Sequence, residues 1–147
     1  MNYDFKLRER KDKGVIGIIE GTLVDFDNPE GLVTKHDWIK IMESEEFQER
    51  LNTRTLFGCV NLNHHIGVDY SMICMSLESI NIVDNKLICS FNLVENKIGF
   101  CIKNMLENNY KITIYPVYIT SKNDLGGSVL EFSHFYVKYQ REEKEEK

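Results

Sequence analysis

The sequence is poor in proline and has no long hydrophobic run, and these absences exclude several classes of protein. Only 2 of its 147 residues are proline, while 42% are hydrophobic and 28% are charged. Such a composition excludes a collagen-like chain and a disordered one. No apolar segment approaches the roughly 20 residues that a membrane-spanning helix needs. The charged N-terminal residues have no apolar stretch behind them, so a signal peptide is not expected.

The chain also lacks an excess of positive charge. Its 18 lysines and arginines are outnumbered by 23 aspartates and glutamates, which gives a net charge of −5. A basic face for nucleic acid is therefore not expected. A chain of 147 residues is long enough to bury a hydrophobic core without a disulfide or a metal ion. We expect one globular domain whose partners are neither nucleic acid nor membrane.

Close cysteine pairs are missing as well. Cys59, Cys74, Cys89 and Cys101 are 15, 15 and 12 residues apart, which fits neither a zinc ribbon nor a Cys-x-x-Cys redox site. All four lie among apolar neighbours, and we predict buried free thiols in a reducing, intracellular setting. Cys59 is the cysteine nearest to a pair of histidines, so a catalytic role for it stays open. No glycine-rich loop precedes a helix, and no cofactor is expected.

The hydrophobic pattern predicts an α+β protein with a small, mainly antiparallel β-barrel. We expect about six strands, at 15–26, 56–65, 72–83, 87–94, 110–120 and 129–139, the fifth interrupted by Pro116. Two helices are expected, one from Thr34 to about Arg50 and one from Asn96 to Asn109, because Thr34 and Asn96 are good N-cap residues. A polar leader at 1–14, either loose or an edge strand, precedes the single domain at 15–139. A charged tail at 140–147 follows it.

The four histidines are the residues best suited to acid–base chemistry near neutral pH. His64 and His65 end an apolar strand, where alternation places them on opposite faces. A histidine at a strand end has a fixed ring that stays open to a substrate. His36 lies in the first turn of a predicted helix, at the surface. His134 and nearby acids have no spacing that demands a metal ion, so metal binding is not expected.

Four segments carry a family resemblance through their order along the chain. Gly17–Phe26 has the pattern Gly-x-x-x-Gly-x-x-x-x-Phe, and the apolar strand at 56–65 ends in the histidine pair. Later come Ile112-Thr113-Ile114-Tyr115 and the β-rich run Val129–Phe135. In this order the segments resemble the prohead protease family of tailed phages, whose fold is that of the herpesvirus assembly protease. The resemblance covers roughly residues 15–137.

The resemblance implies a serine-type endopeptidase that cleaves scaffold or capsid peptides in the assembling prohead, within the host cytoplasm. It places the catalytic histidine at His64 or His65, and the nucleophile at Thr113, where the family has serine. Glu131 or a second histidine would orient the imidazole, and backbone N–H groups would hold the oxyanion. The family also implies a homodimer or a larger homo-oligomer.

Two other interpretations stay open. One is a catalytically inactive relative that keeps the fold as a structural or protein-interaction module in virion assembly. It is favoured because an internal threonine such as Thr113 has no N-terminal amine to activate it. A shift in register would also put Ile114 or Tyr115 in the nucleophile's place. The other is a small binding module on an unrelated α+β fold, in which Thr113 is an ordinary strand residue and Glu131 a solvent-facing acid.

Overall fold

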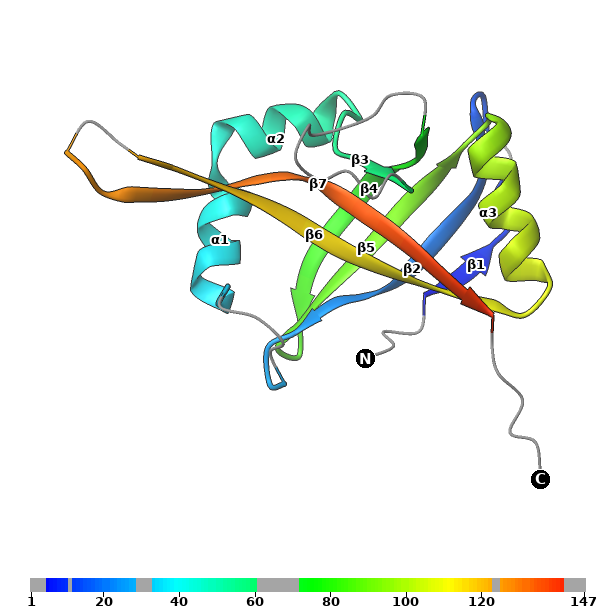
Figure 1. The fold of residues 1–147 in the computed structure, drawn as a ribbon, viewed down its shortest axis with the longest axis horizontal. Helices are drawn as coiled ribbons and strands as arrows, with labels where there is room; N and C mark the ends of the chain where they lie inside the picture. The colour runs from blue at the N-terminus through cyan, green and yellow to red at the C-terminus, as the bar shows by residue number, and fades with distance from the viewer. Residues whose placement is uncertain (1–4, 11, 29–32, 61–71, 123–124, 142–147) are drawn as a thin grey trace.

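A curled sheet with helices at its two ends makes up the computed structural model (Figure 1). The structure describes residues 5–10, 12–28, 33–60, 72–122 and 125–141. In this part of the chain the strands are β1 (Lys6–Arg8), β2 (Val15–Asp25), β3 (Phe57–Cys59), β4 (Ile73–Val83), β5 (Lys86–Val94), β6 (Tyr110–Lys122) and β7 (Ser128–Arg141). The helices are α1 (Lys35–Glu43), α2 (Glu45–Asn52) and α3 (Lys97–Glu107). The α+β class is confirmed, with one more strand and one more helix than predicted.

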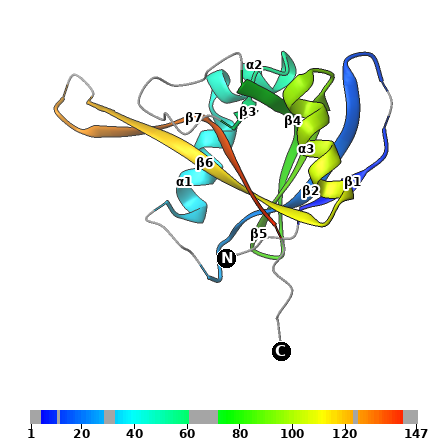
Figure 2. The same cartoon turned by 45° about the vertical axis from the view of Figure 1, so that its right-hand side comes forward.

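The strands form one sheet in the order β1-β2-β5-β4-β3-β7-β6. Neighbouring strands are antiparallel except β3 and β7, which are parallel. The sheet curls strongly, but no described residues pair β6 with β1 (Figure 2). The barrel-like sheet that the sequence predicted is therefore an open half-barrel. The additional strand is β1, which comes from the polar leader and pairs with β2 at one edge.

The β4–β5 hairpin turns at Asp84 and Asn85, between the two strands predicted at 72–83 and 87–94. Both residues have positive φ, 49° and 63°. A two-residue turn with positive φ at both positions matches the right-handed twist of the strands that it joins. The hairpin thereby brings β4 and β5 together at the centre of the sheet, where Leu77 of β4 and Phe91 of β5 pair and are fully buried.

The first predicted helix is two helices, because Ser44 breaks it. Thr34 caps α1 as predicted, in a capping box in which its hydroxyl accepts from the Asp37 N–H and its own N–H donates to the Asp37 carboxylate. Ser44 then takes an extended conformation, with φ −68° and ψ 145°, and ends α1. The Ser44 hydroxyl accepts a hydrogen bond from the Phe47 N–H and so begins α2.

β6 and β7 form a long two-stranded ribbon that extends past α1 (Figure 1). At its base Tyr110 pairs with Arg141, and near its tip Lys122 pairs with Ser128. Pro116 does not interrupt β6, contrary to the prediction. β6 is the last strand of the sheet, and a strand continues through a proline where the missing N–H faces a free edge.

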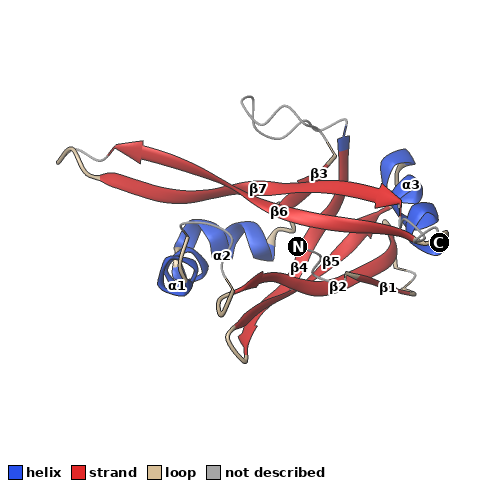
Figure 3. Cartoon of the chain, turned by 60° about the horizontal axis from the view of Figure 1, so that its bottom comes forward, coloured by secondary structure: helices blue, strands red, loops and turns tan. Residues whose placement is uncertain are grey.

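The helices cover opposite ends of the ribbon (Figure 3). α1 and α2 lie beside its outer half, where the fully buried Trp38 donates its indole N–H to the Tyr118 hydroxyl over 2.9 Å. α3 packs against β4, β5 and β6 at the other end, and Asn96 caps it as predicted. Gly99, in the first turn of α3, lies so close to the Val94 carbonyl that no side chain would fit there.

All four cysteines are free thiols, as predicted. Cys59, Cys74 and Cys89 are buried, and burial raises the pKa of Cys74 and Cys89. Cys101 is exposed on α3, so the prediction of a buried thiol is wrong at this position. The residue that this turn of the helix buries is Ile102.

Candidate functional site

The predicted catalytic residues fall in separate parts of the chain. His64 and His65 lie outside the described residues. Thr113 is half-buried in β6, where it pairs with Lys138 of β7. Its neighbours in β6, Ile112 and Ile114, are buried in the core. Because side chains alternate along a strand, the Thr113 hydroxyl is on the outward face of the sheet.

Glu131 and Thr113 are far apart along the ribbon. Glu131 is exposed on β7 and pairs with Ile119, six residues after Thr113 in β6. Since an antiparallel strand rises about 3.4 Å per residue, the two lie about 20 Å apart along the ribbon. One imidazole cannot bridge that distance, so the structure does not bring Glu131 beside the Thr113 hydroxyl.

The end of β3 is level with a pair of tyrosines. Cys59, the last residue of β3, pairs with Tyr136 of β7, which pairs with Tyr115 of β6. The Tyr115 and Tyr136 rings stack with their centroids 6.1 Å apart. The pKa of Tyr136 is raised, mainly by burial and to a smaller extent by the nearby Tyr115 and Cys59. β3 leads toward His64 in the sequence, and the β6 residue level with its end is Tyr115, two residues from Thr113.

A β-bulge in β7 carries a hydroxyl–imidazole pair that sequence reasoning missed. Val117 pairs with His134 and Tyr118 with Phe132, which leaves Ser133 as the extra residue of the bulge. Ser133 Oγ lies 2.8 Å from Nδ1 of His134, whose side chain is almost completely buried. Adjacent strand residues normally point to opposite faces, so nothing in the sequence signals this contact.

Arg50 of α2 holds the same bulge from the helix side. Its Nη1 donates to the Phe132 carbonyl over 3.2 Å, and its Nη2 donates to the Ser133 carbonyl over 2.6 Å. The guanidinium carbon also lies 5.9 Å from the centroid of the Phe132 ring, within cation–π range. Arg50 therefore fixes α2 to the point at which the ribbon bends.

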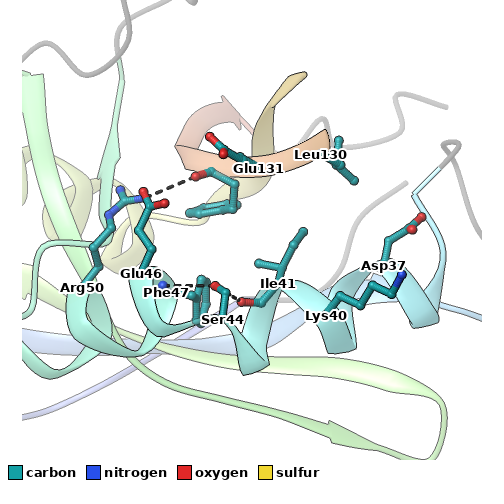
Figure 4. A pocket seen from close by; sticks show the side chains of 10 residues that line it. Asp37, Lys40, Ile41, Ser44, Glu46, Phe47, Arg50, Leu130 and Glu131 are labelled. Atoms are coloured by element: carbon teal, nitrogen blue, oxygen red, sulfur yellow. Dashed lines mark hydrogen bonds between the residues drawn. The ribbon is translucent and has the colours of Figure 1, made fainter. Parts of the chain in front are cut away.

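A pocket of about 510 Å³ lies between α1, α2 and the outer half of β7 (Figure 4). Its lining comes from both helices and from one stretch of β7: Asp37, Lys40, Ile41, Ser44, Glu46, Phe47, Arg50, Leu130, Glu131 and Phe132. Of the predicted catalytic residues that the structure describes, Glu131 lines the pocket and Thr113 does not. The pocket beside the outer ribbon is thus separate from the predicted nucleophile.

Within the described ranges, no three or more histidine, cysteine, aspartate or glutamate side chains gather in a way that could hold a metal ion. No described helix has the length and apolar character to cross a membrane.

A comparison with solved structures defines the class of fold. The curled sheet, with one helix pair beside the ribbon and α3 at the other end, is the fold of a phage capsid assembly protease. One similar structure is that of the bacteriophage T4 capsid assembly protease, gp21, with a TM-score of 0.65 over 92% of this chain and 91% of that chain. The two sequences are 12% identical. The predicted likeness to the prohead protease fold is thereby confirmed, while no protein-family model and no curated protein matches the sequence.

Proposed function

We propose that this protein acts in the assembly of a phage-type head, where it binds peptide segments of scaffold or capsid proteins. The observation that carries the proposal is the fold likeness to gp21, which extends over 92% of this chain and 91% of that one. The likeness therefore covers nearly the whole of both compared chains. A protein partner also agrees with the net charge of −5, which does not favour nucleic acid.

The geometry favours a role that does not depend on cleavage through Thr113. The outward position in β6 carries a threonine, whose extra methyl group crowds the approach to a carbonyl and which, as an internal residue, has no N-terminal amine of its own. Tyr115, and not a small hydroxyl residue, is level with the end of β3. Glu131 is about 20 Å from Thr113 along the ribbon. We therefore favour a catalytically inactive interaction module with the protease fold.

A threonine-type endopeptidase is the second candidate, and the direction of β3 favours it. β3 runs parallel to β7 toward the level of Lys138, the partner of Thr113, and the sequence after β3 contains His64 and His65. In this mechanism Thr113 Oγ1 attacks the scissile carbonyl carbon, and His64 or His65 takes the hydroxyl proton and delivers it to the leaving amine. Water then hydrolyses the ester on Thr113.

One experiment separates the two candidates and tests the role in assembly itself. The purified protein is incubated with capsid and scaffold proteins and, separately, with a fluorophosphonate probe, beside Thr113→Ala and the matched control Thr120→Ala in the exposed part of β6. Binding without cleavage or labelling supports the interaction module. Cleavage that Thr113→Ala abolishes and Thr120→Ala retains supports the endopeptidase, and cleavage that both variants retain removes Thr113 from the mechanism. Absence of binding to any scaffold or capsid protein overturns the proposal.

A further inference from the structure

The first strand of the sheet is short, and the strand beside it is much longer. In the described residues β1 pairs with β2 only from Ile18 to Glu20, whereas β5 pairs with the other side of β2 from Val15 to Asp25. β1 is also the terminal strand of the sheet (Figure 2). Because few backbone hydrogen bonds hold it, β1 should open at a lower free energy than the central strands.

Two glycines of β2 make room for side chains of the segment that contains β1. A Cβ atom added to Gly21 would lie 2.8 Å from Cδ1 of Phe5, and one added to Gly17 would lie 3.1 Å from Cδ1 of Leu7. Both distances are shorter than ordinary van der Waals contact. The two glycines, which we call the glycine notches, belong to the Gly-x-x-x-Gly pattern of the sequence. The Phe5 and Leu7 side chains therefore occupy space that larger residues in β2 would fill.

The side chains in the notches are the apolar ones of an alternating segment. Phe5 is 7% exposed, and its ring centroid lies 6.2 Å from that of the core residue Phe91. Leu7 is half-buried against the same core, while Lys6 and Arg8 are exposed. The segment thus binds β2 as an extended peptide ligand binds a sheet edge, where backbone pairing gives affinity and pockets for alternate side chains give specificity.

The solvent side of the same edge carries a carboxylate that suits a basic residue. Arg8 Nη1 lies 3.3 Å from Oε2 of Glu20, in an ion pair whose side chains are 64% and 39% exposed. The Ser90 hydroxyl of β5 donates to Oε1 of Glu20 over 3.0 Å and helps to fix the carboxylate. An exposed pair adds little affinity, but it disfavours an acidic residue at the position of Arg8.

We propose that the edge of β2 is a docking site for an extended segment of the partner protein, and that the chain's own residues 5–8 occupy it until the partner displaces them. The partner segment carries an aromatic and a large aliphatic side chain two residues apart, followed at once by a basic residue, as Phe5, Leu7 and Arg8 do. A longer partner strand can pair with β2 beyond the three residues that pair with β1, which offsets the high effective concentration of an attached strand. That the partner is a scaffold or capsid protein rests on the function proposed above.

Peptide binding to the full chain tests the site. The probe is a fluorescein-labelled peptide with the sequence of residues 2–10, and fluorescence anisotropy measures its affinity. Phe5→Ala/Leu7→Ala should bind the probe about tenfold more tightly than the unsubstituted protein, because its own strand competes less well for the notches. Lys6→Ala, which removes an exposed side chain from the same strand, should bind it as the unsubstituted protein does. A probe with alanine in place of its phenylalanine and leucine should bind none of these proteins.

Two further measurements separate docking at β2 from a general loss of folding. Gly21→Ala puts a methyl group against Phe5, so it should loosen the chain's own strand and also keep the probe out. Circular dichroism checks that each variant keeps its fold. In the unsubstituted protein, the amides that pair β1 with β2 should exchange with deuterium about tenfold faster than the paired amides of β4 and β5.

Equal affinity of the probe for the unsubstituted protein and for Phe5→Ala/Leu7→Ala, no binding to either, or exchange of β1 as slow as that of β5 overturns the inference. A mass that doubles at high protein concentration, and returns to that of a monomer when the unlabelled peptide is added, assigns the edge to a second copy's strand and overturns the assignment to a partner. If intact scaffold or capsid proteins bind and the unlabelled peptide does not compete with them, the proposed function stands and docking at β2 does not.

Discussion

The two halves of the β6–β7 ribbon differ in what they pack against. The inner half joins the sheet through β3, and its core side chains, including Ile112, Ile114, Phe135 and Val137, are buried inside the curl. The outer half has helices for neighbours: Tyr118 and Phe132 pack against Trp38 of α1. One continuous hairpin therefore contributes to two different surfaces of the molecule.

The bulge at Ser133 marks the boundary between these halves, and the predicted site is divided by it. Thr113 belongs to the inner half and Glu131 to the outer half. A shared fold therefore does not mean that all residues matched to a family motif lie in one site. The structure shows which half of the ribbon contains each residue. The predictions below test whether the two halves are stabilised independently of each other.

The largest effect is expected for Phe135→Ala in the inner half. Phe135 is fully buried and its ring contacts those of Phe91 and Phe132, at centroid distances of 4.8 and 4.7 Å. Truncation of a buried phenylalanine should lower the free energy of unfolding by about 3–5 kcal/mol. Urea denaturation followed by circular dichroism measures it, with the exposed Phe100→Ala as a control expected to change it by about 0.5 kcal/mol or less. A small effect at Phe135 would show that the inner half is not the stable part.

The next effect concerns the joint between the halves. Arg50→Ala removes a charged donor from the carbonyls of Phe132 and Ser133 and should cost about 2–3 kcal/mol. Hydrogen exchange should become faster in the outer ribbon and stay unchanged in the inner one. Arg50→Lys keeps the charge but cannot donate to both carbonyls with the geometry of a guanidinium. Its free energy of unfolding should lie between those of the unsubstituted protein and Arg50→Ala. Equal acceleration in both halves would contradict the view that the bulge is a joint.

A smaller effect is expected at the Trp38–Tyr118 contact of the outer half. Tyr118→Phe leaves the buried Trp38 N–H without its acceptor and should cost about 1–2 kcal/mol near neutral pH. Burial raises the pKa of Tyr118 above its ordinary value of about 10. Above about pH 10 the unfolded chain releases the phenol proton while the folded protein keeps it, so the free energy of unfolding falls as pH rises.

The pH dependence gives this prediction its own measurement. Urea denaturation at pH 9 and pH 11 should show that the unsubstituted protein loses more stability than Tyr118→Phe over this interval. The difference approaches about 1.4 kcal/mol for each pH unit in which only the unfolded tyrosine is ionised. Parallel losses in the two proteins would mean that the Tyr118 phenol is not held protonated by the fold.

The smallest effect on stability, and a distinct effect on association, is expected at Pro116. Pro116→Thr restores a backbone N–H in the edge strand β6 and adds a β-branched residue, so the free energy of unfolding should change by about 0.5 kcal/mol or less. If the residue-116 N–H points away from β7, it can pair with a second copy, since unpaired edge strands promote association. Light scattering after size-exclusion chromatography should show a higher average mass than for the unsubstituted protein. An unchanged mass at high concentration would show that Pro116 does not protect the edge.

Local signals in the sequence predicted the elements whose ends are fixed by their own residues. The Thr34 and Asn96 caps lie where the sequence indicated, and the Asp84–Asn85 turn joins the strands predicted at 72–83 and 87–94. The break at Ser44 was missed because the apolar stripe continues across it, although a serine followed by two glutamates is itself a helix-start signal. Pro116 was misjudged because only tertiary structure shows that β6 is an edge strand.

The site was less predictable than the fold, since it depends on register and on irregular backbone. The separation of Thr113 from Glu131 follows from thirteen paired positions of one ribbon, which strand patterns do not specify. The Ser133–His134 contact depends on a bulge, and the Arg50 contacts join residues more than eighty positions apart. His64 and His65 lie outside the described residues, so their role stays a prediction.

The uneven burial of the cysteines provides a reporter that needs no substitution. Cys101 is the one exposed thiol, and Cys59, Cys74 and Cys89 are sealed in the sheet. A maleimide dye should therefore react first with Cys101 on α3. Slower labelling of the three buried cysteines would report how often the curled sheet opens. The rate of that second, slow labelling measures transient unfolding directly, in a protein that otherwise carries its native sequence.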